Sequence, residues 1–138
     1  MLGEFNSRMG LRLVEIGPER IVGTIPVDGN RQPYGLLHGG ANAAMAEALG
    51  SIGSALHAGP DRVAMGVELS CTHHRAARTG HLTGVCTPLH VGNTLCTWET
   101  VVTDEQGRRI CTARLTCIIR DAPPGGLELV RPRPDTTP

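Results

Sequence analysis

The sequence predicts an α+β domain in which an antiparallel sheet of about five to six strands wraps around one central helix. Two observations predict this fold class. Residues 39–59 have the spacing and composition of a helix, and the segments on both sides of it alternate apolar and polar residues as half-buried strands do. Two strands, one helix and then strands in series is an order typical of α+β domains.

The first two strands are expected at residues 11–17 and 19–27, which are rich in β-branched residues and meet at a Gly-Pro turn. The helix is expected at residues 39–59 and ends at Gly59 and Pro60, because Pro cannot continue a helix. Four apolar residues recur in it at helical spacing, namely Met45, Leu49, Ile52 and Leu56.

Strand-like segments then follow in series, at residues 62–75, 80–90, 94–104 and 108–120. The last two are joined by a hairpin turn at residues 105–107. In the first segment, alternation predicts one face directed toward the helix, made of Val63, Met65, Val67, Leu69, Cys71 and His73. His74 is expected to face the opposite way.

The two ends of the chain are expected to lie outside the fold. We interpret residues 1–8 as a vector-derived leader and residues 9–120 as the folded domain. Residues 121–138 contain five prolines and few apolar residues, a composition that cannot offset the entropy lost on ordering. We therefore expect a flexible Pro-rich tail there.

The composition argues against several classes of partner. Thirteen basic and thirteen acidic side chains cancel, which removes the global field that attracts nucleic acid or an anionic membrane. Three aromatic residues are too few for a platform that stacks single-stranded nucleic acid. No apolar stretch approaches the roughly 20 residues that span a bilayer, and no signal sequence opens the chain, so we expect a cytoplasmic protein.

The cysteines predict neither a disulfide framework nor a metal site. Five cysteines are an odd number, scattered through predicted strands, as is typical of buried thiols in a reducing compartment. Cys71, His73, His74 and His90 contain no CxxC or HxxxH pair that would close a set of zinc ligands. We expect no bound metal.

The segment QPYGLLHGG, residues 32–40, runs directly into the predicted helix. Its last backbone N–H groups are unpaired donors at a helix N-terminus, where they can stabilise the oxyanion of a tetrahedral intermediate. Gly39 and Gly40 would let a substrate carbonyl approach the backbone closely. The alternative is a Gly-rich turn that only starts a helix.

Glu47 is the only charged residue between Arg31 and Asp61 and is flanked by alanines and Leu49. A carboxylate in such surroundings is unfavourable unless it has a role, and catalysis as a general base or nucleophile is one. Ser51 lies one turn later and can reach the same pocket. The alternative places Glu47 in solvent.

The spacing of these residues has a consequence for assembly. His38 and Glu47 are nine residues apart, which is about 13 Å along a helix, so one thioester carbonyl cannot touch both. We therefore expect an obligate dimer in which Gly39 of one subunit faces Glu47 of its partner across a two-fold axis. Small residues would let the two helices approach, namely Ala43, Ala44, Ala46 and Ser54.

Further polar residues follow the first long strand. His73 could orient water or the carboxylate of Glu47, or it could be a hydrogen-bonded core histidine. Arg75, Arg78 and the turn at residues 88–94 could hold phosphate, although arginines after a strand more often form a solvated edge.

Taken together these residues resemble the hotdog-fold acyl-CoA thioesterases, in the branch of 4-hydroxybenzoyl-CoA thioesterase, the phenylacetate-pathway thioesterases and 1,4-dihydroxy-2-naphthoyl-CoA hydrolase. The resemblance lies in QPYGLLHGGANAAMAEALGS and extends through GVELSCTHHR, GVCTPLHVG and DEQGRRICTARL, which together cover nearly all of the expected domain. The combination of HGG, the Glu nine residues after its His, the Ser four residues later and HHR further on is specific, whereas HGG alone is not.

The resemblance implies the hotdog fold and hydrolysis of an acyl-CoA, with an aryl or hydroxyaryl acyl group. It implies that Glu47 is the nucleophile or general base and that Gly39 N–H supplies the oxyanion hole. Ser51 and His73 would position Glu47 and the hydrolytic water.

The same resemblance implies that Gln32 and His38 hold the thioester carbonyl. It implies sites between subunits, dimers that pair into tetramers, and no cofactor, since coenzyme A is part of the substrate. Residues expected to contact the acyl-CoA are Arg75, His90, Val91, Gly92, Tyr34 and Met65.

Two other functions remain open from the sequence. A hydratase or dehydratase acting on a 3-hydroxyacyl thioester also uses a His and a carboxylate, but needs both near one carbon. A non-catalytic protein that binds acyl thioesters would give no reason for a lone carboxylate on a helix of small residues.

Overall fold

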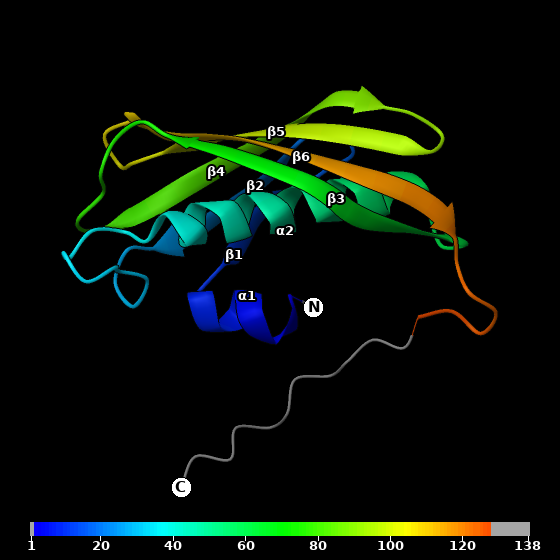
Figure 1. Cartoon of the computed structure of the whole chain (residues 1–138), viewed down its shortest axis with the longest axis horizontal. Helices are drawn as coiled ribbons and strands as arrows, with labels where there is room; N and C mark the ends of the chain where they lie inside the picture. The colour runs from blue at the N-terminus through cyan, green and yellow to red at the C-terminus, as the bar shows by residue number, and fades with distance from the viewer. Residues whose placement is uncertain (1, 128–138) are drawn as a thin grey trace, which may run out of the picture.

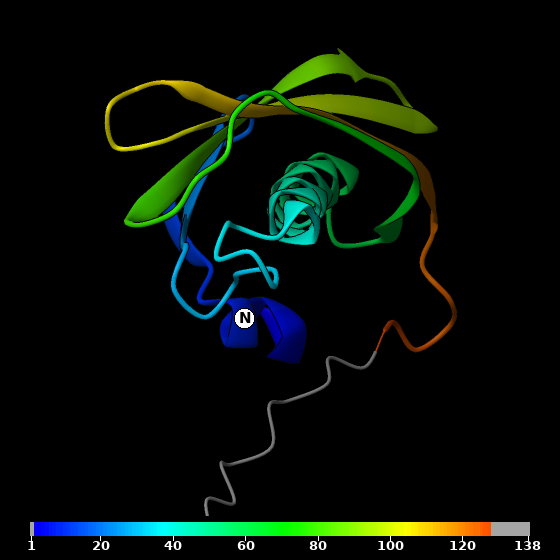
Figure 2. The ribbon, with the colours of Figure 1, turned by 60° about the vertical axis from the view of Figure 1, so that its left-hand side comes forward.

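The computed structural model describes residues 2–127 and confirms the predicted fold class. In chain order its elements are α1 (Gly3–Met9), β1 (Arg12–Ile16), β2 (Ile21–Pro26), α2 (Gly39–Ala58), β3 (Arg62–His73), β4 (His81–Val91), β5 (Leu95–Thr103) and β6 (Arg109–Asp121). The six strands form one sheet in the order β1-β2-β4-β5-β6-β3, and every neighbouring pair is antiparallel. The sheet curves around α2 (Figures 1 and 2).

Close packing of α2 against the sheet depends on glycines. A Cβ added to Gly53 would lie 2.7 Å from the ring of Trp98 on β5, and one added to Gly50 would lie 2.7 Å from Leu115 on β6. The indole N–H of Trp98 donates to Ser54 Oγ at 2.9 Å. The helix is therefore fixed in the curve of the sheet by interlocking shapes and one buried hydrogen bond.

Two of the small residues expected to face a second helix are turned toward the chain's own interior instead. Ser54 is fully buried and bonded to Trp98, and Ala46 is 1% exposed. That part of the prediction is wrong, because the spacing of small residues does not show which side of the helix the sheet occupies. Ala43 and Ala44 are half-buried.

The N-terminal segment contains an element that the sequence did not predict. Residues 3–9 form α1, Leu2 packs against the core, and Met9 is 6% exposed. Figure 2 shows α1 on the open side of the curved sheet, with α2 between them. The vector origin of residues 1–8 stays a prediction, and residues 128–138 of the expected tail lie outside the described residues.

The predicted alternation of β3 is wrong over its first half. A β-bulge between Gly66 and Glu68 inserts one residue into the pairing with β6, which reverses the side on which the following residues lie. Met65 and Val67 are consequently 47% and 56% exposed, whereas Leu69 beyond the bulge packs against the core as expected. Since β3 is an edge strand, nothing within residues 2–127 covers this surface.

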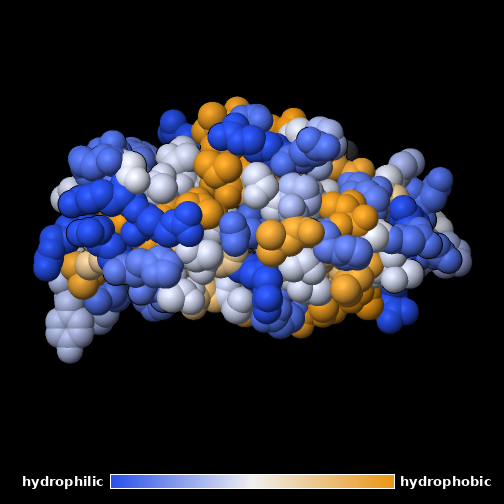
Figure 3. All heavy atoms as spheres, turned by 90° about the horizontal axis from the view of Figure 1, so that it is seen from above, coloured by the Kyte–Doolittle hydropathy of each residue, from blue (hydrophilic) through white to orange (hydrophobic). Residues whose placement is uncertain are grey.

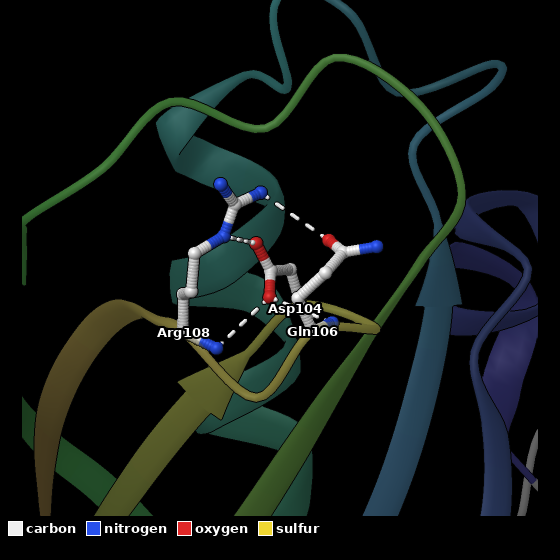
Figure 4. Close-up of polar contacts among 3 residues, drawn as sticks. All are labelled: Asp104, Gln106 and Arg108. Carbon is white, nitrogen blue, oxygen red and sulfur yellow. Dashed lines mark hydrogen bonds and ion pairs between the residues drawn. The ribbon is translucent and has the colours of Figure 1, made fainter.

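The predicted hairpin between β5 and β6 is confirmed and is held by Asp104 (Figure 4). Its Oδ1 accepts from the backbone N–H groups of Gln106 and Arg108 at 3.0 and 2.9 Å, and its Oδ2 accepts from Arg108 Nε at 2.7 Å. Burial acts to raise the pKa of Asp104, but the hydrogen bonds from Arg108 and Gln106 outweigh it and lower this pKa. The Arg108 side chain is thus bonded within the turn.

The outer face of the sheet is of mixed polarity. Figure 3 looks onto this face and shows apolar side chains scattered among polar ones. The outward positions of β5 and β6 that alternate with buried ones include Thr97, Val101, Thr112, Thr116 and Ile118. No helix within residues 2–127 has both the length and the apolar character needed to cross a membrane.

Replacing Gly53 by Ala tests the packing of α2. The better helix propensity of Ala is worth up to about 1 kcal/mol, but overpacking against a rigid indole costs about 1–3 kcal/mol, so we expect a net loss of about 1 kcal/mol in the free energy of unfolding. Urea denaturation measures it. Gly50→Ala, which meets the flexible end of Leu115, should lose less, and a Gly53→Ala chain that is more stable than wild type would contradict this packing.

Candidate active site

The first turn of α2 presents an unpaired backbone donor. His38 is the N-cap residue, and its Nδ1 accepts from Gly40 N–H at 2.8 Å. The next donor, Ala41 N–H, bonds to His38 O at 2.9 Å. Gly39 N–H has no hydrogen-bond partner within residues 2–127, and it points out of a helix N-terminus.

A pocket of about 370 Å3 opens beside this turn. Four residues predicted for the site line it, namely Gln32, Gly39, His73 and Arg75. His73 lies so close to Gly39 that a Cβ at position 39 would be 2.9 Å from Nε2 of the imidazole, so a side chain here would close the gap. The His73 side chain lies on the helix-facing side of β3, as predicted.

Gln32 is oriented by its own turn. Its side-chain Oε1 accepts from the backbone N–H of Tyr34, and its backbone N–H bonds to Leu36 O at 2.7 Å. Because the carbonyl oxygen faces a donor, the NH2 group of the Gln32 amide is left to donate. Tyr34 itself is 85% exposed and lines none of the pockets described here.

Glu47 lies in a second pocket, of about 450 Å3, on the same helix. Ser51 lines it too, and its wall includes Leu2 and, from α1, Phe5. The carboxylate lies against the backbone of β3 at Gly66, where a Cβ would collide with Oε1. Within residues 2–127 no cation pairs with Glu47, so this half-buried carboxylate is free to act on a ligand.

The two pockets share no lining residue. The structure therefore brings together Gln32, Gly39 and His73 in one place, and Glu47 and Ser51 in another. His73 and the Glu47 of the same chain line different pockets, so a role for His73 in orienting Glu47 stays a prediction that requires a second subunit. This separation agrees with the spacing in the sequence, which predicts that His38 and Glu47 lie about 13 Å apart along the helix.

Other predicted site residues lie apart from both pockets. His38 lines a third pocket, of about 560 Å3, with Phe5, Arg31 and Gly40. Met65 points outward as a result of the bulge in β3. The turn with His90, Val91 and Gly92 lies at the C-terminal end of α2, where His57 Nε2 bonds to Gly92 O at 2.9 Å.

The sequence did not single out Asn42. This residue lines the same pocket as Gly39 and His73, is 3% exposed, and its Nδ2 lies 3.3 Å from His73 Nδ1. Asn42 follows Gly39 by three residues and so shares its side of the helix. A polar residue in this position among alanines was the signal that could have found it.

The cysteines are not candidate nucleophiles. All five thiols are free, and burial raises the pKa of Cys111 to about 12 and that of Cys86 to about 11. Burial also raises the pKa of Cys117, which lies near Ser54 and Ser51. Since the thiolate is the nucleophile, these groups are inert at neutral pH. Within residues 2–127, no three His, Cys, Asp or Glu residues gather closely enough to hold a metal ion.

The raised pKa values predict the response to a thiol-reactive dye. At pH 8 the native chain should react slowly at Cys86 and Cys111. The rate of reaction at these two thiols should rise only as the pH approaches about 11 to 12, where they deprotonate. Stopped-flow absorbance measures this rate, with chain unfolded in urea as the control for fast reaction. Fast labelling of Cys86 at pH 8 in the native chain would contradict the burial described.

Comparison with known proteins gives one consistent result. The model of the family described as the thioesterase superfamily matches residues 34–111. The proofreading thioesterase EntH of Cronobacter turicensis is 44% identical over 86% of this chain and 87% of its own. A thioesterase of Haemophilus influenzae superimposes with a TM-score of 0.82 at 30% identity, covering 85% of this chain and 82% of that one.

A structure of a hypothetical thioesterase of Streptococcus pneumoniae with coenzyme A has the same fold. Its TM-score is 0.73 at 19% identity, and the match covers 83% of this chain and 90% of that one.

Proposed function

The chain belongs to the thioesterase superfamily and is a thioester hydrolase, and we propose that its substrate is the thioester of an aryl or hydroxyaryl acid with coenzyme A. The products would be the free acid and coenzyme A. The proposal includes membership of the branch of 4-hydroxybenzoyl-CoA thioesterase, which the resemblance of the sequence implies. The observation that carries the proposal is Glu47, a carboxylate on a helix of small residues that faces a pocket and has no cation partner among residues 2–127.

Thioester hydrolysis needs hydrogen-bond donors for the carbonyl oxygen and a base or nucleophile, and the candidate site contains both. Gly39 N–H and the NH2 group of Gln32 are the donors available to a thioester carbonyl, and they would stabilise the oxyanion as it forms. Glu47 either attacks the carbonyl carbon itself or takes a proton from the water that attacks. The bond between carbon and sulfur then breaks, and the thiolate of coenzyme A takes up a proton. If Glu47 is the nucleophile, the acyl group is then held on Glu47 as an anhydride, and water hydrolyses this anhydride to the free acid and restores the carboxylate.

The separation of the two pockets supports a site shared by two subunits. Glu47 lies eight residues after Gly39, or about 12 Å along α2, which is too far for one thioester carbon to meet both in one chain. In a two-fold dimer the Glu47 of one subunit would face the Gly39 of the other. Sedimentation at micromolar concentration tests this, because a fully active monomer would contradict the proposal.

The edge strand β3 supports the same assembly. Its outward side chains Met65 and Val67 are exposed, and an uncovered edge carries backbone groups ready to pair with another strand. Pairing of β3 with its copy would cover them. Association of such dimers into tetramers is part of the proposal.

The position of the nucleotide follows from this assembly. Arg75 lies at the Gly39 pocket, whereas the turn with His90, Val91 and Gly92 lies at the opposite end of α2. If the two α2 helices run antiparallel, the turn of one subunit approaches Arg75 of the other. Both would then contact the phosphates of coenzyme A.

The acyl group would occupy the Glu47 pocket. Ile52 of α2 and Ala64 of β3 contribute apolar surface to its wall. The aryl character of the acyl group follows from the resemblance of the sequence to the 4-hydroxybenzoyl-CoA branch. The dehydratase alternative loses support, because the relatives are thioesterases.

Thiol release from a panel of aryl- and alkyl-CoA thioesters tests the proposal. Glu47→Gln keeps the shape of the side chain but removes the base or nucleophile, so we expect kcat to fall by about 10²- to 10⁴-fold. The matched control is Glu99→Gln, which removes a carboxylate from the outer face of β5 and should leave turnover unchanged. Undiminished turnover by Glu47→Gln would exclude Glu47 from the mechanism, and a panel in which alkyl thioesters react fastest would contradict the aryl substrate.

A further inference from the structure

We propose that Asn42 is a positioning residue that holds His73 in the tautomer with its proton on Nε2, so that His73 Nε2–H joins Gly39 N–H as a second donor to the thioester oxygen. This inference rests on the proposed function, because it concerns the same thioester. It adds a residue that the sequence did not single out and gives His73 a role distinct from positioning Glu47.

The contact between Asn42 and His73 fixes one ring nitrogen. Asn42 Nδ2 lies 3.3 Å from His73 Nδ1, and the Asn42 side of this contact is buried, since Asn42 is 3% exposed. A neutral imidazole has one donor nitrogen and one acceptor nitrogen. If Nδ1 accepts from the Asn42 amide, the proton is on Nε2.

The other ring nitrogen lies at the unpaired helix N-terminus. A Cβ at Gly39 would lie 2.9 Å from His73 Nε2 and 3.1 Å from Cε1, so the ring edge is adjacent to the Gly39 backbone. Gly39 N–H itself has no partner within residues 2–127. Gly39 N–H and His73 Nε2 are therefore adjacent in a pocket that Asn42 also lines, and two adjacent donors are what an oxyanion site needs.

The amide of Asn42 contributes little to the stability of the fold. Among residues 2–127 its Oδ1 is buried without a hydrogen-bond partner, and an unpaired buried acceptor destabilises a protein relative to an apolar group of the same shape. The one hydrogen bond that the amide makes within the described part of the chain is with His73. An interaction that does not stabilise the fold and reaches only a pocket residue is what a positioning role requires.

The opposite orientation of the amide makes the opposite prediction. With Oδ1 toward Nδ1, the proton would be on Nδ1 and the Nε2 lone pair would face the pocket, where it could accept but not donate. The two tautomers differ in their 15N chemical shifts. Nitrogen NMR of the imidazole in the substrate-free protein therefore decides between them.

We expect wild-type His73 to show a protonated Nε2 and an unprotonated Nδ1. In Asn42→Asp the carboxylate can only accept, so the proton should move to Nδ1, and in Asn42→Ala the two tautomers should mix. Asn42→Ala should also lower kcat by roughly tenfold or more with KM little changed, since loss of a full oxyanion donor costs about 10²- to 10³-fold. Its melting temperature should be unchanged or higher.

Two substitutions of His73 itself separate a donor from a base. The amide nitrogen of Gln reaches the position of Nε2 and that of Asn the position of Nδ1, so His73→Gln should retain more turnover than His73→Asn. If His73 acted as a base instead, both substitutions would remove the base, and both variants should lose turnover to the same extent. Ser54→Ala is the structural control, because it removes a buried hydrogen bond to Trp98 and should lower the melting temperature without moving the His73 shifts or kcat.

Two results would overturn the inference: a wild-type His73 with its proton on Nδ1, or an Asn42→Ala chain with full kcat. Failure of the proposed function is distinguishable, since the nitrogen shifts are measured without substrate. Suppose that no thioester of the panel is hydrolysed, but that Nε2 is protonated in wild type and not in Asn42→Asp. Asn42 would then position His73 as inferred, and the proposed substrate would be wrong.

Discussion

The interlocking of α2 with the sheet determines the geometry of everything else in this molecule. Gly50 and Gly53 let Leu115 and Trp98 approach the helix backbone, and the Trp98 indole bonds to Ser54. A helix held in this way along its length cannot rotate or slide without opening a packed core. The groups carried by α2 are therefore fixed in space, as a catalytic site needs.

The position of each group along α2 then decides which pocket it enters. Gly39 and Asn42 occupy the first turn, Glu47 lies near the middle of the helix, and His57 lies in the last turn beside the loop at Gly92. An α-helix of 20 residues is about 30 Å long, so its ends cannot serve one small reacting group. One chain thus presents two separate groups of candidate site residues, and the proposed function joins them through a second copy.

Most of the fold was predictable from the sequence because alternation and helical spacing are local signals. Two features were not. The bulge in β3 is invisible in the sequence because Val63, Met65 and Val67 keep the alternation of a regular strand, and only pairing with β6 shows the extra residue. Helix α1, at seven residues, is too short to be stable alone and depends on packing of Leu2 and Met9.

The parts of the candidate site that unusual residue types mark were predictable from the sequence. A lone carboxylate at position 47 and glycines at a helix start are unusual in any fold, and helix geometry alone predicted that they are apart. The sequence could not show that His73 would lie at Gly39, since this depends on where β3 crosses the helix. Nor could it show the contact between Asn42 and His73, which joins two elements 31 residues apart.

A mixing experiment tests most directly whether two chains complete one site. Glu47→Gln and Gly39→Val are each expected to be inactive, and the two chains can be coexpressed with different tags and purified as the mixed dimer. The account predicts that this dimer recovers about half of the wild-type activity, because one of its two sites combines an intact Gly39 with an intact Glu47. A mixed dimer as inactive as its parents would show that each chain carries its own complete site.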